Sequence, residues 1–172
     1  TVGWKPFFMG NYILLLTQTC SQPSMVAFIL DKLEIKPGNS ILEIGSGCGY
    51  AAAIASKLCG NTGKVWAIEI IPELISIMKN NLMEEYPNIS IINKDGSTGL
   101  PTEMPFDRIF LSAGVCSDTF NNDVLLNQLT DNGILIYPEK KGNLYKIIKR
   151  KSGNEIIEYQ GVNFVPLIGE NT

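Results

Sequence analysis

Residues 40–50 read Ser40-Ile41-Leu42-Glu43-Ile44-Gly45-Ser46-Gly47-Cys48-Gly49-Tyr50, a short apolar run followed by three alternate glycines and then a helical pattern. Glycine has no side chain and tolerates left-handed backbone angles, so a chain leaving a strand can turn sharply and lie against a ligand. The spacing differs from the Gly-x-Gly-x-x-Gly of dinucleotide sites, because Tyr50 takes the third glycine position and Gly49 comes one residue early. The turn therefore predicts a cofactor site of another nucleotide type. The alternative is a glycine-rich turn that binds nothing.

The spacing Glu-x-Gly-x-Gly-x-Gly, formed by Glu43, Gly45, Gly47 and Gly49, resembles motif I of the class I S-adenosylmethionine-dependent methyltransferases. This resemblance implies a Rossmann-like fold and S-adenosyl-L-methionine as the cofactor. The two residues between the glycines, Ser46 and Cys48, are included in the predicted cofactor site.

Length and charge limit the possible functions. A chain of 172 residues with 45% hydrophobic residues is long enough for one buried α/β core, so we expect a single domain over residues 1–172. The net charge of -3 gives no general attraction to a phosphate backbone, and we expect no nucleic-acid partner. We also expect a monomer. The densest basic cluster is interpreted as a solvated strand edge, and it comprises Lys140, Lys141, Lys146, Lys149, Arg150 and Lys151.

The cysteines and the absence of histidine argue against a metal site. Cys20, Cys48, Cys59 and Cys116 are scattered without a Cys-x-x-Cys pair, and no histidine is present to complete a zinc site. Reduced thiols are expected. The apolar run 12–16 is far shorter than the roughly 20 residues that span a bilayer, and no signal-peptide pattern precedes it. We therefore expect a cytoplasmic protein with no membrane partner.

Helical and strand-like patterns alternate along most of the chain. Their order predicts right-handed βαβ crossovers and an α/β fold with a doubly wound, mostly parallel sheet that is covered on both faces. After residue 138 only strand-like runs remain, at 144–149 and 156–165, which predicts antiparallel C-terminal strands at one edge. Helices are predicted at 23–33, 51–58, from 72 to 82 and around 124–129, and strands at 40–44, 64–69, 89–92, 106–112 and 133–137.

Polar residues follow the predicted parallel strands. Ligands of such sheets occupy the crevice outside the carboxyl ends of the strands, so these residues should converge there. Glu69 ends the second strand 20 residues after Gly49, where a carboxylate can accept hydrogen bonds from both ribose hydroxyls. Glu43 has two equally acceptable roles: it holds the ligand's ammonium group through water, or it caps nearby backbone amides.

Several further segments resemble the protein-L-isoaspartate (D-aspartate) O-methyltransferase family, from about residue 18 to 169. Thr-x-Ser-Gln-Pro at 19–23 and Phe-Val-Pro-Leu at 164–167 are characteristic of that family. The other matching segments are Met25-Val26-Ala27-Phe28, Ile68-Glu69, Ile71-Pro72-Glu73-Leu74, Asp95-Gly96, Pro105-Phe106-Asp107-Arg108-Ile109 and Gln128-Leu129.

This resemblance implies an enzyme that uses S-adenosylmethionine to methylate the α-carboxyl of isoaspartyl residues in damaged proteins, which would be its partners. Ser21 falls on the family's active-site serine, and Thr19 and Cys20 fall in the segment over the cofactor. We expect the single domain to be without the N-terminal helical section that is usual in the family. The remaining positions that fall in the cofactor site are Gly45, Gly47, Gly49, Glu69, Ile70, Asp95 and Gly96.

The chemistry of this reaction suits a chain without histidine. An isoaspartyl carboxyl, with a pKa of about 3.9, is already ionised at pH 7 and can attack a sulfonium methyl without a general base. Ser21 would position that carboxylate by a hydrogen bond, although it could also cap the helix that starts near Pro23.

Two alternatives to this function remain. The segment Leu15–Ser24 lacks the glycines that family members usually carry before the serine. A non-catalytic family member that binds S-adenosylmethionine is therefore one alternative, and a carboxyl methyltransferase acting on another peptide acceptor is the other.

Overall fold

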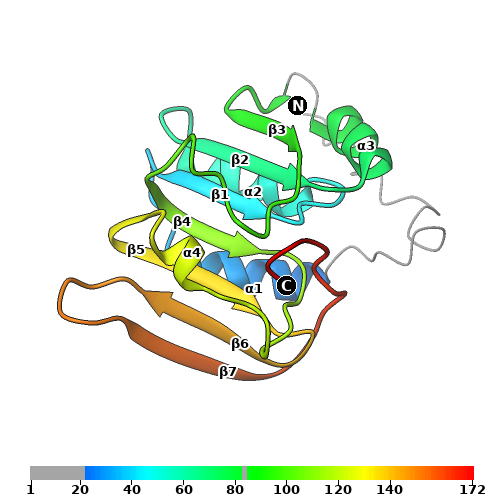
Figure 1. Ribbon diagram of the computed structural model, residues 1–172. Helices are drawn as coiled ribbons and strands as arrows, with labels where there is room; N and C mark the ends of the chain where they lie inside the picture. The colour runs from blue at the N-terminus through cyan, green and yellow to red at the C-terminus, as the bar shows by residue number, and fades with distance from the viewer. Residues whose placement is uncertain (1–21, 83–84) are drawn as a thin grey trace.

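The computed structural model describes residues 22–82 and 85–172, which form one seven-stranded sheet with flanking helices (Figure 1). The strand order is β3-β2-β1-β4-β5-β6-β7. In chain order the elements are α1 (Pro23–Leu33), β1 (Ser40–Ile44), α2 (Tyr50–Cys59), β2 (Lys64–Glu69), α3 (Pro72–Leu82), β3 (Ile89–Asn93), β4 (Phe106–Leu111), α4 (Asp123–Leu126), β5 (Leu129–Pro138), β6 (Lys141–Ile148) and β7 (Glu155–Asn163).

The sheet is parallel from β3 to β5 and antiparallel from β5 to β7, which confirms the predicted architecture. The chain runs outward from β1 to β3, then returns to place β4 on the other side of β1. The strand order therefore reverses between β1 and β4, and such a reversal opens a crevice at the carboxyl ends of the two strands. Backbone hydrogen bonds join the segments that follow these strands to the neighbouring strands. Gly45 N donates to Ile68 O at 2.9 Å, and Ser112 N donates to Ile44 O at 2.9 Å.

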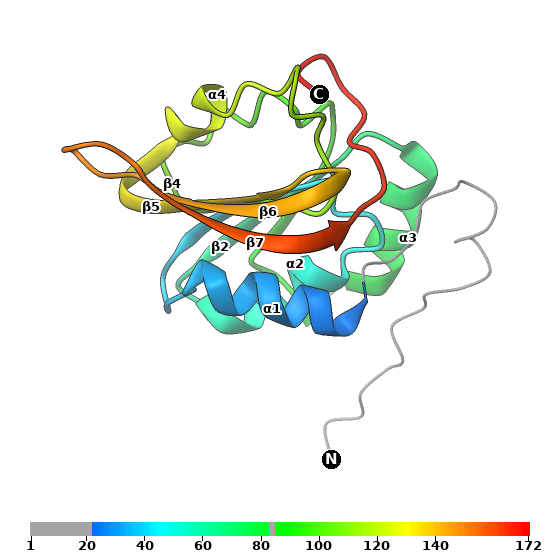
Figure 2. The ribbon, with the colours of Figure 1, turned by 90° about the horizontal axis from the view of Figure 1, so that it is seen from below.

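Helices α1, α2 and α3 cover one face of the sheet, whereas α4 and long loops lie on the other (Figure 2). Successive residues of a strand point to opposite faces, so Ile41 packs in the core under the helices and Leu42 in the core on the α4 side. Helix α2 buries four alanines, which are small enough to let its backbone lie close to the strands: Ala51, Ala52, Ala53 and Ala55.

The end of α1 is fastened to the sheet by two buried cations. Arg108 donates from Nε to Leu33 O at 2.5 Å and from Nη2 to Glu34 O at 3.0 Å, which satisfies carbonyls at the helix end. Lys146 is only 4% exposed, and its Nζ forms a salt bridge with Glu34 Oε1 at 2.5 Å. The prediction of a fully solvated basic edge is thus wrong for Lys146, because its side chain lies under α1.

The fourth predicted helix is also shorter than expected. Helix α4 ends at Leu126, and Leu129 already belongs to β5. Apolar spacing favoured a longer helix, but Phe106 N donates to Gln128 O at 2.8 Å and Leu129 pairs with Phe106. Strand pairing therefore overrides the local helical pattern.

Candidate cofactor-binding site

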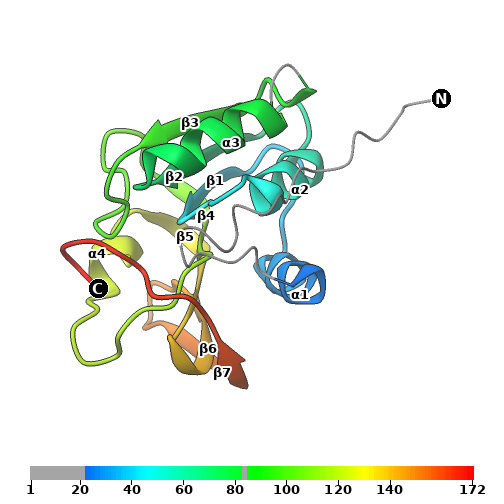
Figure 3. The ribbon, with the colours of Figure 1, turned by 90° about the vertical axis from the view of Figure 1, so that its right-hand side faces the viewer.

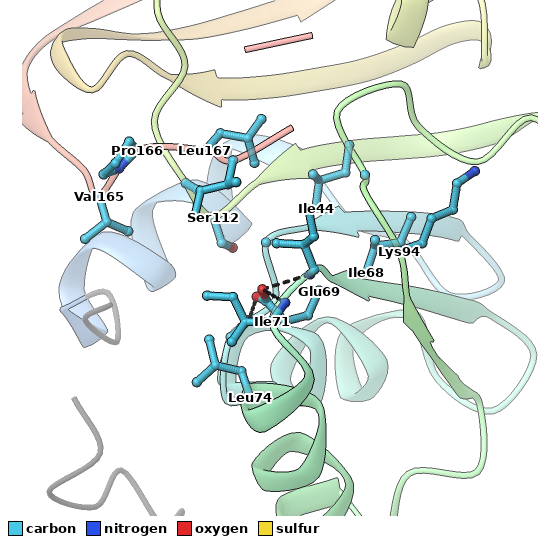
Figure 4. Close-up of a pocket in the computed structure, with 16 residues that line it drawn as sticks. Ile44, Ile68, Glu69, Ile71, Leu74, Lys94, Ser112, Val165, Pro166 and Leu167 are labelled. Atoms are coloured by element: carbon cyan, nitrogen blue, oxygen red, sulfur yellow. Dashed lines mark hydrogen bonds between the residues drawn. The ribbon is translucent and has the colours of Figure 1, made fainter. Parts of the chain in front are cut away.

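A pocket lies at the carboxyl ends of β1, β2, β3 and β4 (Figure 4). Its walls come from five parts of the chain, four of which follow these strands. The fifth is the segment after β7, which runs back across this end of the sheet (Figure 3). The residues that line the pocket are Ile44, Gly45, Gly47, Ile68, Glu69, Ile70, Ile71, Leu74, Lys94, Gly96, Ser112, Ala113, Val165, Pro166, Leu167 and Ile168.

The glycine turn has the backbone geometry that its sequence predicts. Gly45, Gly47 and Gly49 have φ angles of 77°, 55° and 83°, in the region where a side chain is strained. A Cβ on Gly47 would meet nothing within 4 Å, so this residue faces open space beside the pocket. A Cβ on Gly49 would lie 2.7 Å from Met78 Cγ, so Gly49 allows α2 and α3 to pack together. The first two glycines line the site, and the third serves the core.

Glu69 is 5% exposed and organises the turn through backbone N–H groups. Its Oε2 accepts from Gly47 N at 2.9 Å, and its Oε1 accepts from Ile70 N at 2.9 Å and Ile71 N at 3.0 Å. A carboxylate offers about four acceptor positions, so these bonds leave about one for a ligand hydroxyl. Glu69 therefore fixes the shape of the pocket as well as lining it.

Glu43 is fully buried and incompletely hydrogen-bonded. Its Oε1 accepts from Ser112 Oγ at 2.7 Å, whereas its Oε2 has no hydrogen-bond partner among the described residues. Burial raises the pKa of Glu43 to about 7, against the opposing effect of the Ser112 and Ser46 hydroxyls. The expectation that Glu43 caps backbone amides is not met among the described residues, where its hydrogen-bond donor is the hydroxyl of Ser112. The other expectation, an ammonium group held through water, stays a prediction.

The structure brings together part of the predicted site. Gly45, Gly47, Glu69, Ile70 and Gly96 line the pocket. The remaining described candidates are not among the residues that line it, and they are Glu43, Ser46, Cys48, Gly49 and Asp95. Thr19, Cys20 and Ser21 lie outside the described residues, so their roles stay predictions. The helix predicted to start near Pro23 does so, and Gln22 takes its N-cap position.

Sequence reasoning missed the wall formed by residues 165–168. Gly114 N donates to Val165 O at 2.7 Å, and Leu167 N donates to Gly114 O at 2.7 Å, so this segment pairs with the chain leaving β4. The Phe-Val-Pro-Leu motif at 164–167 was the available signal. On sequence alone this motif indicates the family, and it does not indicate a wall of the pocket.

Metal and membrane features can be assessed only where the structure describes the chain. Within residues 22–82 and 85–172, no group of three or more histidine, cysteine or acidic residues is placed to hold a metal ion. In the same ranges, no helix has the length and apolar character required to cross a membrane. Within the same ranges, no disulfide bond involves Cys48, Cys59 or Cys116.

Comparison with known proteins identifies the family. The profile of the protein-L-isoaspartate(D-aspartate) O-methyltransferase family matches residues 6–172. This chain belongs to that family. A protein-L-isoaspartate O-methyltransferase of Methanococcoides burtonii is 43% identical over 159 residues, which cover 89% of this chain and 76% of the relative. One from Fervidobacterium nodosum is 42% identical over 156 residues, covering 87% of this chain and 76% of the relative.

The solved structures agree with the family assignment. A protein-L-isoaspartate O-methyltransferase structure matches with a TM-score of 0.79 and 27% identity. The match covers 88% of this chain and 49% of that one, so the chain spans about half of that solved family member. A methyltransferase of Geobacter sulfurreducens in complex with S-adenosyl-L-homocysteine matches with a TM-score of 0.58 over 70% of this chain and 49% of that one. At 16% identity, it supports the fold alone.

Proposed function

We propose that this chain is a protein-repair methyltransferase, which transfers a methyl group from S-adenosylmethionine to the α-carboxyl of L-isoaspartyl residues, and to the free side-chain carboxyl of D-aspartyl residues, in damaged proteins. The observation that carries the proposal is the pocket built from the glycine turn and Glu69 in a chain of this family. Its proposed partners are damaged proteins or peptides.

The residues around the pocket suit S-adenosylmethionine. When bound, this cofactor supplies an electrophilic methyl group on a positively charged sulfur. Glu43 provides a buried acceptor oxygen with no partner among the described residues, and a nearby cation would stabilise its charged form. Gly47 leaves open space for close approach to the backbone, and Gly45, Ile70 and Gly96 line the same pocket. The four pocket residues are the contacts we propose for the cofactor, and Glu43 would hold its ammonium group through water.

Glu69 would accept a ribose hydroxyl. Three backbone N–H groups already occupy its carboxylate, so about one acceptor position is left for the ligand. A contact to both hydroxyls would therefore require one backbone bond to be shared or released. The same three bonds keep the carboxylate oriented before the ligand arrives, which reduces the ordering needed on binding.

The acceptor carboxylate needs alignment more than activation. It is ionised at neutral pH, so no proton has to be removed before it attacks the methyl group. Orienting two reactants can supply up to about 7 to 11 kcal/mol of the barrier reduction. We propose that Ser21 contributes by donating a hydrogen bond to the acceptor carboxylate, as its place in the family motif implies.

The test is methyl transfer to a matched pair of peptides. The chain is incubated with labelled S-adenosylmethionine and either an isoaspartyl peptide or its normal aspartyl twin. A base-labile methyl ester on the isoaspartyl peptide alone is the expected result. Calorimetric binding of the cofactor without transfer to any peptide would reject the enzyme and favour a binding protein. Transfer to a different carboxyl peptide would change the acceptor.

A serine pair tests the proposed role of Ser21. Ser21→Ala should reduce turnover at least tenfold while the affinity for S-adenosylmethionine is largely kept, because the lost hydrogen bond is to the acceptor. Ser24→Ala is the matched control, since Ser24 is an exposed residue of α1. Equal turnover in both variants would remove Ser21 from the mechanism.

A further inference from the structure

The segment 165–171, called the strap below, forms one wall of the pocket although it lies far from the glycine turn in sequence. Val165–Ile168 line the pocket, and the strap crosses the carboxyl end of the sheet (Figures 1 and 3). Ile168 is 49% exposed at this position, so an apolar side chain stands at the pocket where a ligand can cover it. What holds the strap therefore influences the shape of the site.

A group of polar residues fastens the far end of the strap. Asp95 Oδ2 accepts from Glu170 N at 2.9 Å, and Ser97 Oγ accepts from Asn171 N at 3.1 Å. The Asn171 side chain donates to Ser97 O and Asn121 O, both at 3.1 Å, and accepts from Asn121 N at 3.0 Å. These bonds join the strap to the loops after β3 and β4. We call Asp95, Ser97, Asn121 and Asn171 the latch.

The geometry of Asp95 differs from that of a residue that faces the ligand. Its neighbours Lys94 and Gly96 line the pocket, but Asp95 does not. Each of its oxygens accepts a backbone N–H, with Ser97 N bound to Oδ1 at 2.8 Å. Burial opposes ionisation of Asp95, but the bonds from Ser97 and Glu170 outweigh it and lower the pKa, so the carboxylate is charged at neutral pH.

Gly169 lets the strap lie directly against Asp95 and Ser97. A Cβ at Gly169 would overlap Asp95 Oδ1, its nearest neighbour, and would lie 2.7 Å from Ser97 Oγ and 2.8 Å from Ser97 Cβ. The φ angle of Gly169 is not in the left-handed region, so the requirement for glycine is one of space. A methyl group there would push the strap away from the latch.

We infer that Asp95 is a positioning residue, which holds the strap as a wall of the S-adenosylmethionine pocket through the latch. The identity of the ligand rests on the proposed function. Without the latch, the strap is held mainly by its bridge to Gly114 and occupies open states. The apparent affinity for the cofactor then falls with the fraction of molecules that have the wall in place.

One strap variant, one latch variant and one control test the inference in the full chain. Gly169→Ala and Asn171→Ala should weaken calorimetric binding of S-adenosylmethionine by roughly tenfold, with kcat at saturating cofactor within about twofold of wild type. Amides of Gly114 and Leu167 should exchange hydrogen faster in both variants. Glu170→Ala keeps the backbone N–H that Asp95 accepts, so it should bind like wild type. Thermal unfolding verifies that each variant is folded.

A double-mutant cycle separates positioning from direct contact. If Asp95 acts through the strap, Asp95→Ala and Asn171→Ala break the same unit without a direct contact between the two side chains, and the double variant should bind the cofactor about as weakly as the weaker single variant. Additive losses would overturn the inference, and so would unchanged binding and exchange in Gly169→Ala and Asn171→Ala. Failure of the wild-type chain to bind S-adenosylmethionine would instead reject the proposed cofactor, and this inference with it.

Discussion

The amino end of the sheet buries the guanidinium of Arg108, whereas the carboxyl end buries the carboxylate of Glu43, and the two groups differ in their hydrogen bonding. Arg108 donates to three backbone carbonyls, those of Leu33, Glu34 and Asp107. Glu43 receives one hydroxyl, and its second oxygen has no partner in the described part of the chain.

This difference separates a charge that stabilises the fold from one that is available to a ligand. Partners supplied by the protein offset the desolvation of a buried ion, and Arg108 has them. A buried acceptor without a partner lowers stability and persists where a ligand or another function can use it. The contrast between the two ends of the sheet can be tested by substitution.

The largest effect is expected for Arg108→Ala. The change leaves the carbonyls of Leu33 and Glu34 at the end of α1 without their buried donor, and it should lower the free energy of unfolding by about 3 to 5 kcal/mol. Urea denaturation measures the loss. Arg150→Ala is the control, because the Arg150 side chain is 41% exposed and should contribute less than about 1 kcal/mol. Similar losses in the two variants would contradict a stabilising role for the buried guanidinium.

The next largest effect is expected for Gly49→Ala, which is compared with Gly47→Ala. Gly49→Ala combines a left-handed φ with a Cβ placed 2.7 Å from Met78, and should cost about 2 to 4 kcal/mol of stability. Gly47→Ala meets nothing within 4 Å and should cost about 1 kcal/mol, while its methyl group reduces cofactor affinity. Thermal unfolding and calorimetry measure the two properties. The prediction fails if Gly47→Ala is the more destabilised protein.

The pH dependence of stability tests Glu43. Its folded pKa of about 7 lies above the ordinary value of 4.5, so between these values the folded chain holds a proton that the unfolded chain has released. The contribution of Glu43 to stability is therefore present below pH 4.5, is lost as the pH rises towards 7 and is constant above that. Relative to Glu43→Gln, wild type should lose on the order of 2 kcal/mol between pH 5 and 8. Parallel curves for the two proteins would refute the raised pKa.

Proton release on cofactor binding is a second test of the raised pKa of Glu43. A cation near the unpaired oxygen of Glu43 favours the charged carboxylate, so binding of S-adenosylmethionine at pH 6.5 should release a fraction of a proton. Calorimetry in buffers with different ionisation enthalpies detects it. Glu43→Gln should show no such release, and equal release in both proteins would place the titrating group elsewhere.

The smallest effect is expected at the surface. Lys151 pairs with Asp131 at 3.1 Å, but the two side chains are 81% and 53% exposed. Solvent weakens such a pair, so Lys151→Ala should change the free energy of unfolding by less than about 0.5 kcal/mol. Urea denaturation at low and high salt provides the measurement. If Lys151→Ala lowered the free energy of unfolding as much as Arg108→Ala, exposure would not explain the different contributions of these two cations to stability.

Most of the sheet could be predicted because its strands are short, apolar and bounded by glycine or proline. The prediction for β2 matches the structure at both ends, from Lys64 to Glu69, and that for β1 also matches. The sequence predicts a fourth helix that is too long, because Leu129 fits a helical spacing equally well until its pairing with Phe106 is known. Lys146 was placed in solvent because sequence cannot show that α1 covers it.

The site could be predicted where one segment supplies the chemistry. The glycine turn and Glu69 follow from their spacing, and both lie at the pocket. The strap and its latch depend on a contact between Asp95 and Glu170, which local sequence does not encode. The unpaired oxygen of Glu43 was also beyond prediction, since it depends on which hydroxyl reaches the carboxylate.

The bridge between Gly114 and Pro166 also sets the timing of assembly. During synthesis the glycine turn leaves the ribosome well before the strap, although both belong to one pocket. The parallel strands can pair while that wall is still missing, but the complete pocket cannot form until residues 165–171 have emerged and docked. Capture of the cofactor by a nascent chain would therefore report that this domain has finished folding.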